Sequence, residues 1–167
     1  LGLNALAHVT SAKALANYLK SKINFKQSNL LILILALLPD VDLLFQNYIG
    51  HRTITHLPYV AFLYGGALGL ALSVKERKGM LKSFLAYGLI SLLHPVIDFF
   101  TGGIPLLDPK VKYGIVLPIP YYNYVHALIA FPNLLYLASS YKLRLENFKG
   151  YVKSLAYKLV GMAKNYK

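Results

Sequence analysis

The sequence predicts an all-α integral membrane protein: a bundle of four to five transmembrane helices with a basic amphipathic C-terminal helix. Three observations predict this class. Hydrophobic residues make up 56% of the 167 residues and charged residues only 14%, whereas soluble domains contain roughly 25% charged residues. Long apolar runs recur without the alternation expected of strands. The lysines and arginines, which give a net charge of +12, gather between and after these runs.

Four apolar segments approach the roughly 20 residues that cross a bilayer as a helix. They cover residues 29–45, 57–74, 83–100 and 121–141. An alanine-rich segment at residues 3–19 favours helix but is less apolar. It either crosses the membrane or lies on its surface, so five or four crossings are expected. Gly65 and Gly69 either allow close helix packing or reflect the abundance of glycine in membrane helices.

The basic residues predict an orientation. If each segment crosses once, 15 of the 18 lysines and arginines share one side, and the other side holds Arg52, Lys110 and Lys112. The positive-inside rule assigns the richer side to the cytoplasm. We therefore expect a multi-pass protein of the plasma membrane with a cytoplasmic C-terminus.

Residues 1–145 are expected to form the transmembrane domain, and residues 146–167 a separate basic tail. In the tail Tyr151, Leu155 and Leu159 recur four residues apart, with lysines at other positions. Such an amphipathic helix suits the surface of an anionic membrane. Membrane lipids are therefore the expected partner rather than nucleic acid, because no nucleic-acid-binding motif accompanies the charge.

All histidines and aspartates fall in the outer half of the predicted topology, although lysine and arginine alone defined that topology. Ionisable groups inside a bilayer are costly and mark function. The chain has no cysteine, so a metal ion would be held by nitrogen and oxygen. Imidazole and carboxylate suit zinc first, with manganese or iron as alternatives. We expect the transmembrane domain to bind such ions near the outer face.

Seven residues are the predicted metal ligands: His8, Asp40, Asp42, His51, His56, His94 and Asp98. They exceed the needs of one four-coordinate ion, so two or more ions sharing an aspartate are expected. His94 and Asp98 share one helical face, as ligands or as a structural ion pair. Pro39 bends its helix, which turns the two aspartates that follow it toward a shared site or leaves them solvated.

Three residues are predicted to support the ligands: His126, Asp108 and Thr55. For His126 a supporting or core position is preferred over direct ligation. Asp108 precedes a proline, where forming a turn is an equal alternative. Either Thr53 or Thr55 suits the cap of the helix that follows. Arg52 and Asp42 are predicted to be catalytic. Arg52 would hold a phosphate oxygen, or would be a charge on the outer surface.

These motifs together resemble the YdjM-like family of predicted membrane-bound metal-dependent hydrolases. The matching pieces are His8, LLPDVD at 37–42, HRTITH at 51–56 and LLHPVIDFFTGGIPLLDP at 92–109. The family remotely resembles zinc phospholipase C and the S1/P1 nucleases, which also use an H-x-x-x-D helix in a multi-zinc site. The chain departs from the family pattern at Thr53, Leu57 and Asp108. These departures leave the substrate more open than metal binding.

The expected function is hydrolysis of a phosphoester, in a phospholipid or a lipid-linked phosphate, at the membrane surface. Paired metal ions can activate water near neutral pH and hold both the attacking and the leaving oxygen. The alternative is a non-catalytic membrane scaffold or adaptor protein whose metal staples the helices together. An adaptor that binds through the basic tail and an ion pathway are further alternatives.

Overall fold

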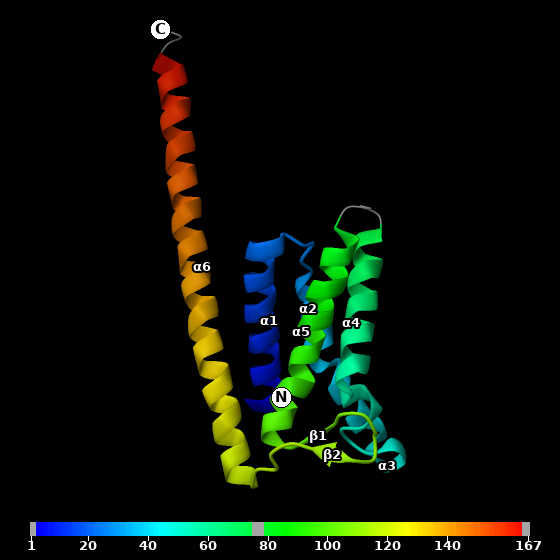
Figure 1. Ribbon diagram of the computed structural model, residues 1–167. Coiled ribbons are helices and arrows are strands. Elements are labelled where there is room, and N and C mark those ends of the chain that lie inside the picture. The colour runs from blue at the N-terminus through cyan, green and yellow to red at the C-terminus, as the bar shows by residue number, and fades with distance from the viewer. Residues whose placement is uncertain (1–2, 75–78, 165–167) are drawn as a thin grey trace. The chain divides into compact units, whose positions relative to one another are not determined.

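The computed structural model describes residues 3–74 and 79–164 (Figure 1). The helices are α1 (Leu3–Ile23), α2 (Asn29–Leu37), the 3₁₀ helix η1 (Leu38–Phe45), α3 (Gln46–Ile49), the 3₁₀ helix η2 (Ile54–His56), α4 (Pro58–Ser73), α5 (Met80–Thr101) and α6 (Ile119–Lys164). Two short strands, β1 (Ile104–Pro105) and β2 (Lys112–Tyr113), pair in antiparallel fashion. The all-helical class is confirmed, and the described residues add one small hairpin that was not predicted.

By its internal contacts the chain divides into two units, residues 1–133 and 134–167. The candidate site lies within the first unit. The predicted boundary after residue 145 stays a prediction. The side chains of residues 147–164, on which the amphipathic pattern of the tail depends, lie outside the described part of the structure. The same holds for Lys75, Arg77 and Lys78 in the predicted cytoplasmic loop.

Two described segments, Asn29–Tyr48 and Met80–Thr101, are long and apolar enough to cross a membrane. Pro58–Ser73 is apolar but shorter. The number of crossings therefore stays a prediction. Predicted segment 121–141 lies within α6, which continues without a break to Lys164.

The α-helix expected over residues 29–45 is wrong in its second half. Helix α2 is capped by Ser28, whose hydroxyl accepts from the Leu31 amide at 3.3 Å, and ends at Leu37. Pro39 follows, and it has no amide hydrogen to donate to the carbonyl one turn back. The chain continues as the 3₁₀ helix η1, which carries Asp40 and Asp42. The bend predicted at Pro39 is thus a change of helix type.

Helix α4 packs along α5 through its glycines. A Cβ added at Gly65 would lie 2.5 Å from Ser91 Cβ, and one at Gly69 would lie 2.5 Å from Tyr87 Cδ2. Of the two sequence readings of these glycines, the structure therefore supports close packing. On the other side, α1 and α2 pack against α5 around a core that includes Ala16, Leu35 and Tyr87.

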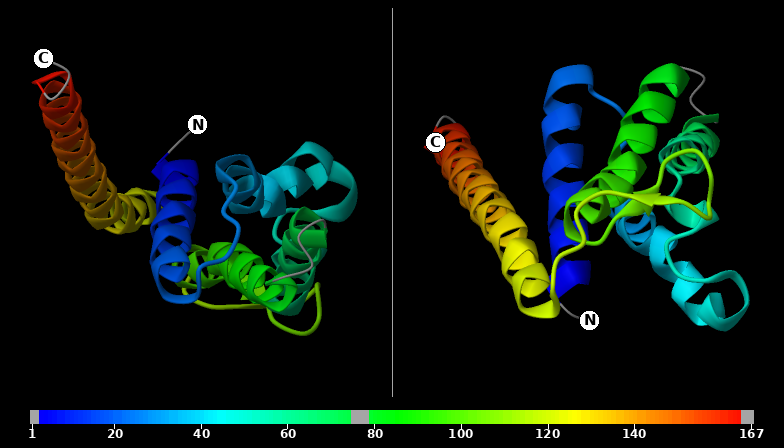
Figure 2. Two further views of the ribbon diagram at one scale, coloured as in Figure 1. Left: turned by 90° about the horizontal axis from the view of Figure 1, so that it is seen from above. Right: turned by 60° about the horizontal axis from the view of Figure 1, so that its bottom comes forward.

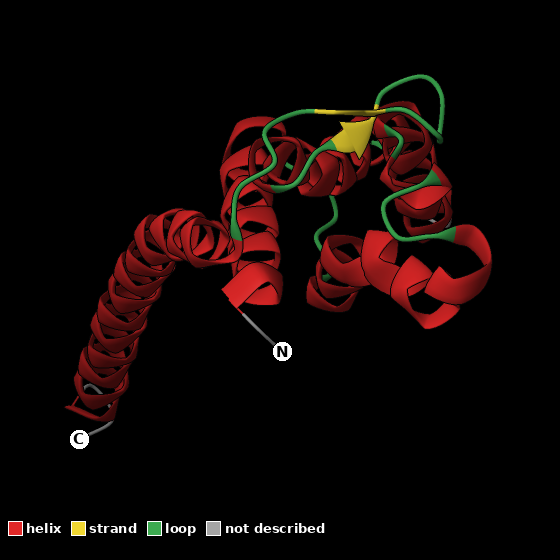
Figure 3. Cartoon of the chain, turned by 90° about the horizontal axis from the view of Figure 1, so that it is seen from below, coloured by secondary structure: helices red, strands yellow, loops and turns green. Residues whose placement is uncertain are grey.

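The hairpin crosses one end of the helices of the first unit (Figures 2 and 3). It is tied to α5, because the Ile115 amide donates to the Phe99 carbonyl at 2.9 Å. It is also tied to the loop before η2, since Lys112 Nζ donates to the His51 carbonyl at 2.9 Å. Strands of two residues are too short to produce an alternating pattern, so the sequence gives no signal for them.

Candidate metal centre

Side chains from five separate elements meet at the end of the bundle that the hairpin crosses. His8 comes from α1, Asp40 and Asp42 from η1, His56 from η2, His94 and Asp98 from α5, and His126 from α6. All of them except Asp40 are at most 2% exposed. Each element contributes only one or two of these residues, so the cluster exists only in the folded chain.

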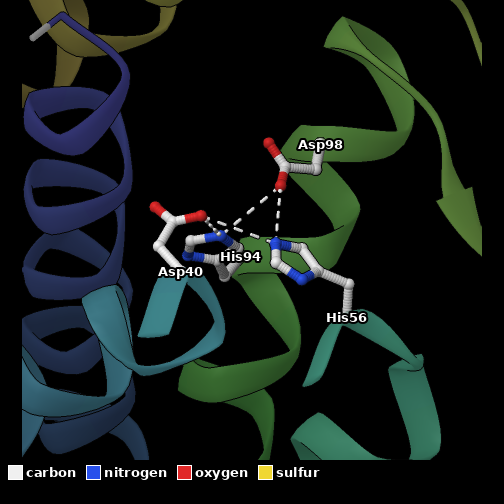
Figure 4. Close-up of side chains that lie close together, drawn as sticks. All are labelled: Asp40, His56, His94 and Asp98. Carbon is white, nitrogen blue, oxygen red and sulfur yellow. Dashed lines mark ion pairs between the residues drawn. The ribbon is translucent and has the colours of Figure 1, made fainter. Parts of the chain in front are cut away.

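The first donor group consists of Asp40, His56, His94 and Asp98 (Figure 4). His56 Nε2 lies 3.2 Å from Asp98 Oδ2 and 3.5 Å from Asp40 Oδ1. His94 Nε2 lies 3.4 Å from each of the same two oxygens. One donor atom from each residue lies within 4.8 Å of all the others. Two imidazole nitrogens and two carboxylate oxygens thus surround one point.

The Nδ1 atoms of His94 and His56 already have partners within the protein. His94 Nδ1 donates to the Ala36 carbonyl at 2.7 Å, where α2 approaches its end. His56 Nδ1 lies 3.1 Å from Thr55 Oγ1 and 3.3 Å from Asp42 Oδ2. Such contacts leave Nε2 of each ring as the atom that faces the centre, as in metal-ligating histidines generally.

Asp42 organises the loop that carries His56. Its carboxylate lies 2.7 Å from His51 Nδ1 and accepts from the Arg52 amide at 2.8 Å and the Thr55 hydroxyl at 2.9 Å. With His51 and His56 it forms another group of potential donors. Since both oxygens already have partners, the geometry favours an orienting position for Asp42 over direct ligation. Thr55 contacts His56 as well, with its hydroxyl 3.1 Å from Nδ1, and its supporting role stays a prediction.

The second donor group consists of His8, Asp98 and His126. His8 Nε2 lies 3.4 Å from Asp98 Oδ1. His126 Nδ1 donates to the Tyr122 carbonyl at 2.8 Å, which leaves its Nε2 as the available donor. The structure therefore brings His126 into a group of potential ligands, where the sequence favoured a supporting position.

Asp98 belongs to both groups and divides its two oxygens between them. Oδ2 faces His56 and His94, and Oδ1 faces His8. The rings of His8 and His94 are stacked, with centroids 3.7 Å apart and planes 9° apart. One carboxylate thus spans two parallel imidazoles, which is an arrangement suited to bridging two cations.

Arg52 completes the buried charges and is 7% exposed. Its Nη2 donates to Asp98 Oδ1 at 3.0 Å and to the Tyr122 hydroxyl at 3.3 Å. Its backbone is left-handed, with φ of 57°. The guanidinium fits against Gly102, where an added Cβ would collide with Nη1. Arg52 is therefore part of the buried cluster and not a charge on the outer surface.

Several donor atoms of the cluster are buried without a hydrogen bond, although they lie near oppositely charged groups. Among the described residues eleven side-chain atoms have this status, and eight of them belong to the cluster. These eight are His8 Nδ1 and Nε2, Asp40 Oδ1, Arg52 Nε, His56 Nε2, His94 Nε2, Asp98 Oδ2 and His126 Nε2. Buried polar atoms are normally paired. The concentration of such atoms here fits a ligand that binds several of them at once.

Charge points to a cation as that ligand. Asp40, Asp42 and Asp98 are three carboxylates, and among the described residues of the cluster Arg52 is their one permanently charged partner. Burial lowers the pKa of His56, but the carboxylates of Asp40 and Asp98 outweigh burial and raise that pKa above its ordinary 6.5. Unbalanced buried carboxylates are costly. The set of nitrogen and oxygen donors fits a divalent ion of the zinc, manganese or iron type.

The remaining predicted residues lie at the edge of the cluster or away from it. The His51 side chain is 29% exposed, pairs with Asp42 and meets the His56 ring edge-on. Asp108 is exposed and accepts from the Lys110 amide at 2.8 Å, so it shapes its own turn. Sequence reasoning missed Tyr122, which contacts both Arg52 and His126. The spacing of four residues between Tyr122 and His126 on one helix was its sequence signal.

A comparison with known protein families identifies the family of this chain. A family model described as the YdjM inner membrane protein matches residues 3–165. The chain belongs to this family. The match covers almost the whole chain and confirms the family resemblance of the sequence motifs. YdjM membership, together with the apolar helices, makes the chain a membrane protein. No curated protein and no solved structure matched the chain.

Proposed function

We propose that this chain is a divalent-metal-dependent hydrolase of a phosphoester, in a phospholipid or a lipid-linked phosphate, at the membrane surface. The observation that carries the proposal is the concentration of buried imidazole and carboxylate donors that lack hydrogen-bond partners. Asp40, His56, His94 and Asp98 would hold one ion, with zinc as the expected metal. We also propose that the site is similar to those of zinc phospholipase C and the S1/P1 nucleases, and that it binds two or more ions.

Bound divalent ions would lower the pKa of water and stabilise charge on phosphate oxygens. In the reaction, a water oxygen forms a bond to phosphorus while the bond to the leaving oxygen breaks, and the leaving oxygen takes up a proton. Arg52 is proposed to hold a phosphate oxygen, which is supported by its buried Nε without a hydrogen-bond partner. Asp42 is proposed to act by orienting His56 and the loop around it.

The proposal includes a membrane setting. The chain would cross the plasma membrane four or five times, with its C-terminus in the cytoplasm and the metal centre near the outer face. The clustering of the described donors at one end of the helices supports this arrangement. A substrate at this depth would present its phosphate at the level of the lipid headgroups. Reporter fusions to the C-terminus test the orientation.

The test is product release by the purified full chain in lipid nanodiscs. Two probes are offered with added Zn²⁺ or Mn²⁺: the soluble diester bis(p-nitrophenyl) phosphate and phosphatidylglycerol. We expect release by the unaltered chain and background release by His94→Ala. Tyr124→Ala is the matched control, because Tyr124 lies in α6 and is 68% exposed. Equal rates in the unaltered chain and His94→Ala would contradict the proposal.

One observation favours a second candidate, a non-catalytic scaffold or adaptor stapled by metal. The first donor group offers four protein donors, enough to fill the shell of a structural zinc ion. In that case chelation lowers the thermal midpoint of the protein, while no phosphoester is cleaved with any added metal. The hydrolase instead loses activity on chelation and regains it on addition of metal.

A further inference from the structure

We infer that His8, Asp98 and His126 form a second cation site with an open coordination position, where an exchangeable water or a phosphate oxygen binds. The inference deepens the proposed function and rests on it only for the identity of the substrate. It assigns different tasks to the two donor groups. The first holds its ion in a shell filled by the protein, and the second presents its ion to the ligand.

The three donors of this site come from three helices that the sequence does not connect closely. His8 and His126 are 1% and 0% exposed, and Asp98 is 0% exposed. Both nitrogens of His8 and Nε2 of His126 lack a hydrogen-bond partner among the described residues. The Tyr122 carbonyl fixes the ring of His126, because it accepts from Nδ1 at 2.8 Å. His8 Nε2 and His126 Nε2 are therefore buried without a hydrogen bond, and a cation would satisfy them together.

The number of donors separates the two sites. Four protein donors close a tetrahedral shell, whereas catalytic zinc sites have three protein donors and one exchangeable position. The second group has three donors, His8, Asp98 and His126. A neighbouring positive charge also suits an anionic ligand here. Arg52 Nη2 bonds Asp98 Oδ1, the same oxygen that faces His8.

Because the two sites share the Asp98 carboxylate, we expect the second ion to bind more weakly than the first. Asp98 Oδ1 already accepts from Arg52 at 3.0 Å, whereas Oδ2 faces imidazoles and lacks a hydrogen bond. A cation at the second site must share Oδ1 with a guanidinium and lie close to its positive charge, which is unfavourable. We therefore expect stepwise binding, with the first group filled first.

The experiment is a Co²⁺ titration of the full, metal-free chain in detergent, followed by visible absorption and by metal analysis of each loaded sample. Inorganic phosphate is then added as the probe of the open position. We expect two ions per chain with distinct affinities, and a change in absorption on phosphate addition only after the second ion is bound. His126→Gln should bind one ion with unchanged first affinity and show no response to phosphate. Tyr124→Ala, on the same helix, should match the unaltered chain.

Retention of the first ion by His126→Gln shows that this variant is folded. His8→Gln tests the same site from another helix, and the same loss of the second ion is expected. Equal stoichiometry in His126→Gln and the unaltered chain would overturn the inference. So would loss of both ions from both variants with helix content retained, because the two groups would then form a single site. Two ions without a phosphate response would overturn the open position. A phosphate response without phosphoester cleavage would leave this site standing and contradict the hydrolase.

Discussion

Tyr87 in the first half of α5 and His94 and Asp98 in its second half are all at most 2% exposed, but they differ in how their polar atoms are satisfied. In the first half the Tyr87 hydroxyl accepts from the Ser28 amide at 2.7 Å and donates to the Lys26 carbonyl at 3.0 Å. In the second half His94 Nε2 and Asp98 Oδ2 lack hydrogen bonds, although both residues are at most 2% exposed. The Tyr87 hydroxyl thus has its hydrogen bonds within the protein and needs no ligand. The second half, by contrast, is arranged for a ligand, and burial alone would not have distinguished the two.

The largest effect is expected from His94→Ala in the second half of α5. The substitution removes one imidazole from the first group and leaves Asp40 and Asp98 facing each other without it. Breaking a buried ion pair costs about 3–5 kcal/mol. We expect loss of tightly bound metal, background hydrolysis and a lower thermal midpoint. Metal analysis and thermal unfolding in detergent measure these effects. Unchanged metal content would mean that the two halves do not differ as described.

A substitution in α4, where it packs against the middle of α5, should separate stability from metal binding. Gly65→Leu places a side chain where even a Cβ would lie 2.5 Å from Ser91 Cβ. Overpacking of this kind costs about 1–3 kcal/mol. The thermal midpoint should fall, while the folded fraction keeps the metal content of the unaltered chain. Leu63→Ala is the matched control, because Leu63 lies in the same helix and is 56% exposed. Metal loss in Gly65→Leu at full helix content would contradict the separation.

Asp42→Asn tests whether a residue that contacts the ligand His56, without binding the ion itself, changes the metal affinity of the first donor group. The substitution keeps the size of the side chain but removes the charge that faces His51 and His56. Loss of such supporting contacts costs about 10–100-fold in metal affinity. A zinc titration against a competing chelator measures the change. Complete loss of the first ion would instead indicate that Asp42 is a direct ligand.

The smallest effect is expected from pH. Burial lowers the pKa of His56, but Asp40 and Asp98 raise it overall above 6.5. In the metal-free chain the proton on His56 therefore contributes stability that is present below pH 6.5 and is lost as pH rises through the raised pKa. Metal binding has the opposite sign, since the ion must displace this proton. Zinc affinity should fall by up to about tenfold per unit as pH falls. If the stability of the chain changed with pH in the same way with and without zinc, this assignment would be contradicted.

The sequence predicted the helical class, the side-by-side position of His94 and Asp98, and the gathering of histidines and aspartates at one end. Each depends on local periodicity or on the order of apolar and basic segments, and both can be read from one sequence. It did not predict that Pro39 would switch the helix type or that Asp42 would organise the loop, because both depend on three-dimensional contacts. Nor did it predict that His126 would lie in a group of potential donors with His8 and Asp98. The 27 residues that separate His126 from Asp98 give no indication that the two side chains meet.

We infer that the unpaired donors at the end of the bundle that the hairpin crosses bind cations. Elemental analysis of the pure full chain, expressed as metal ions per chain and compared with His94→Ala, tests this claim most directly. We expect more than one zinc or manganese ion per unaltered chain and a lower content in the variant. A chain that remains metal-free after incubation with these ions, while it is folded, would contradict the account.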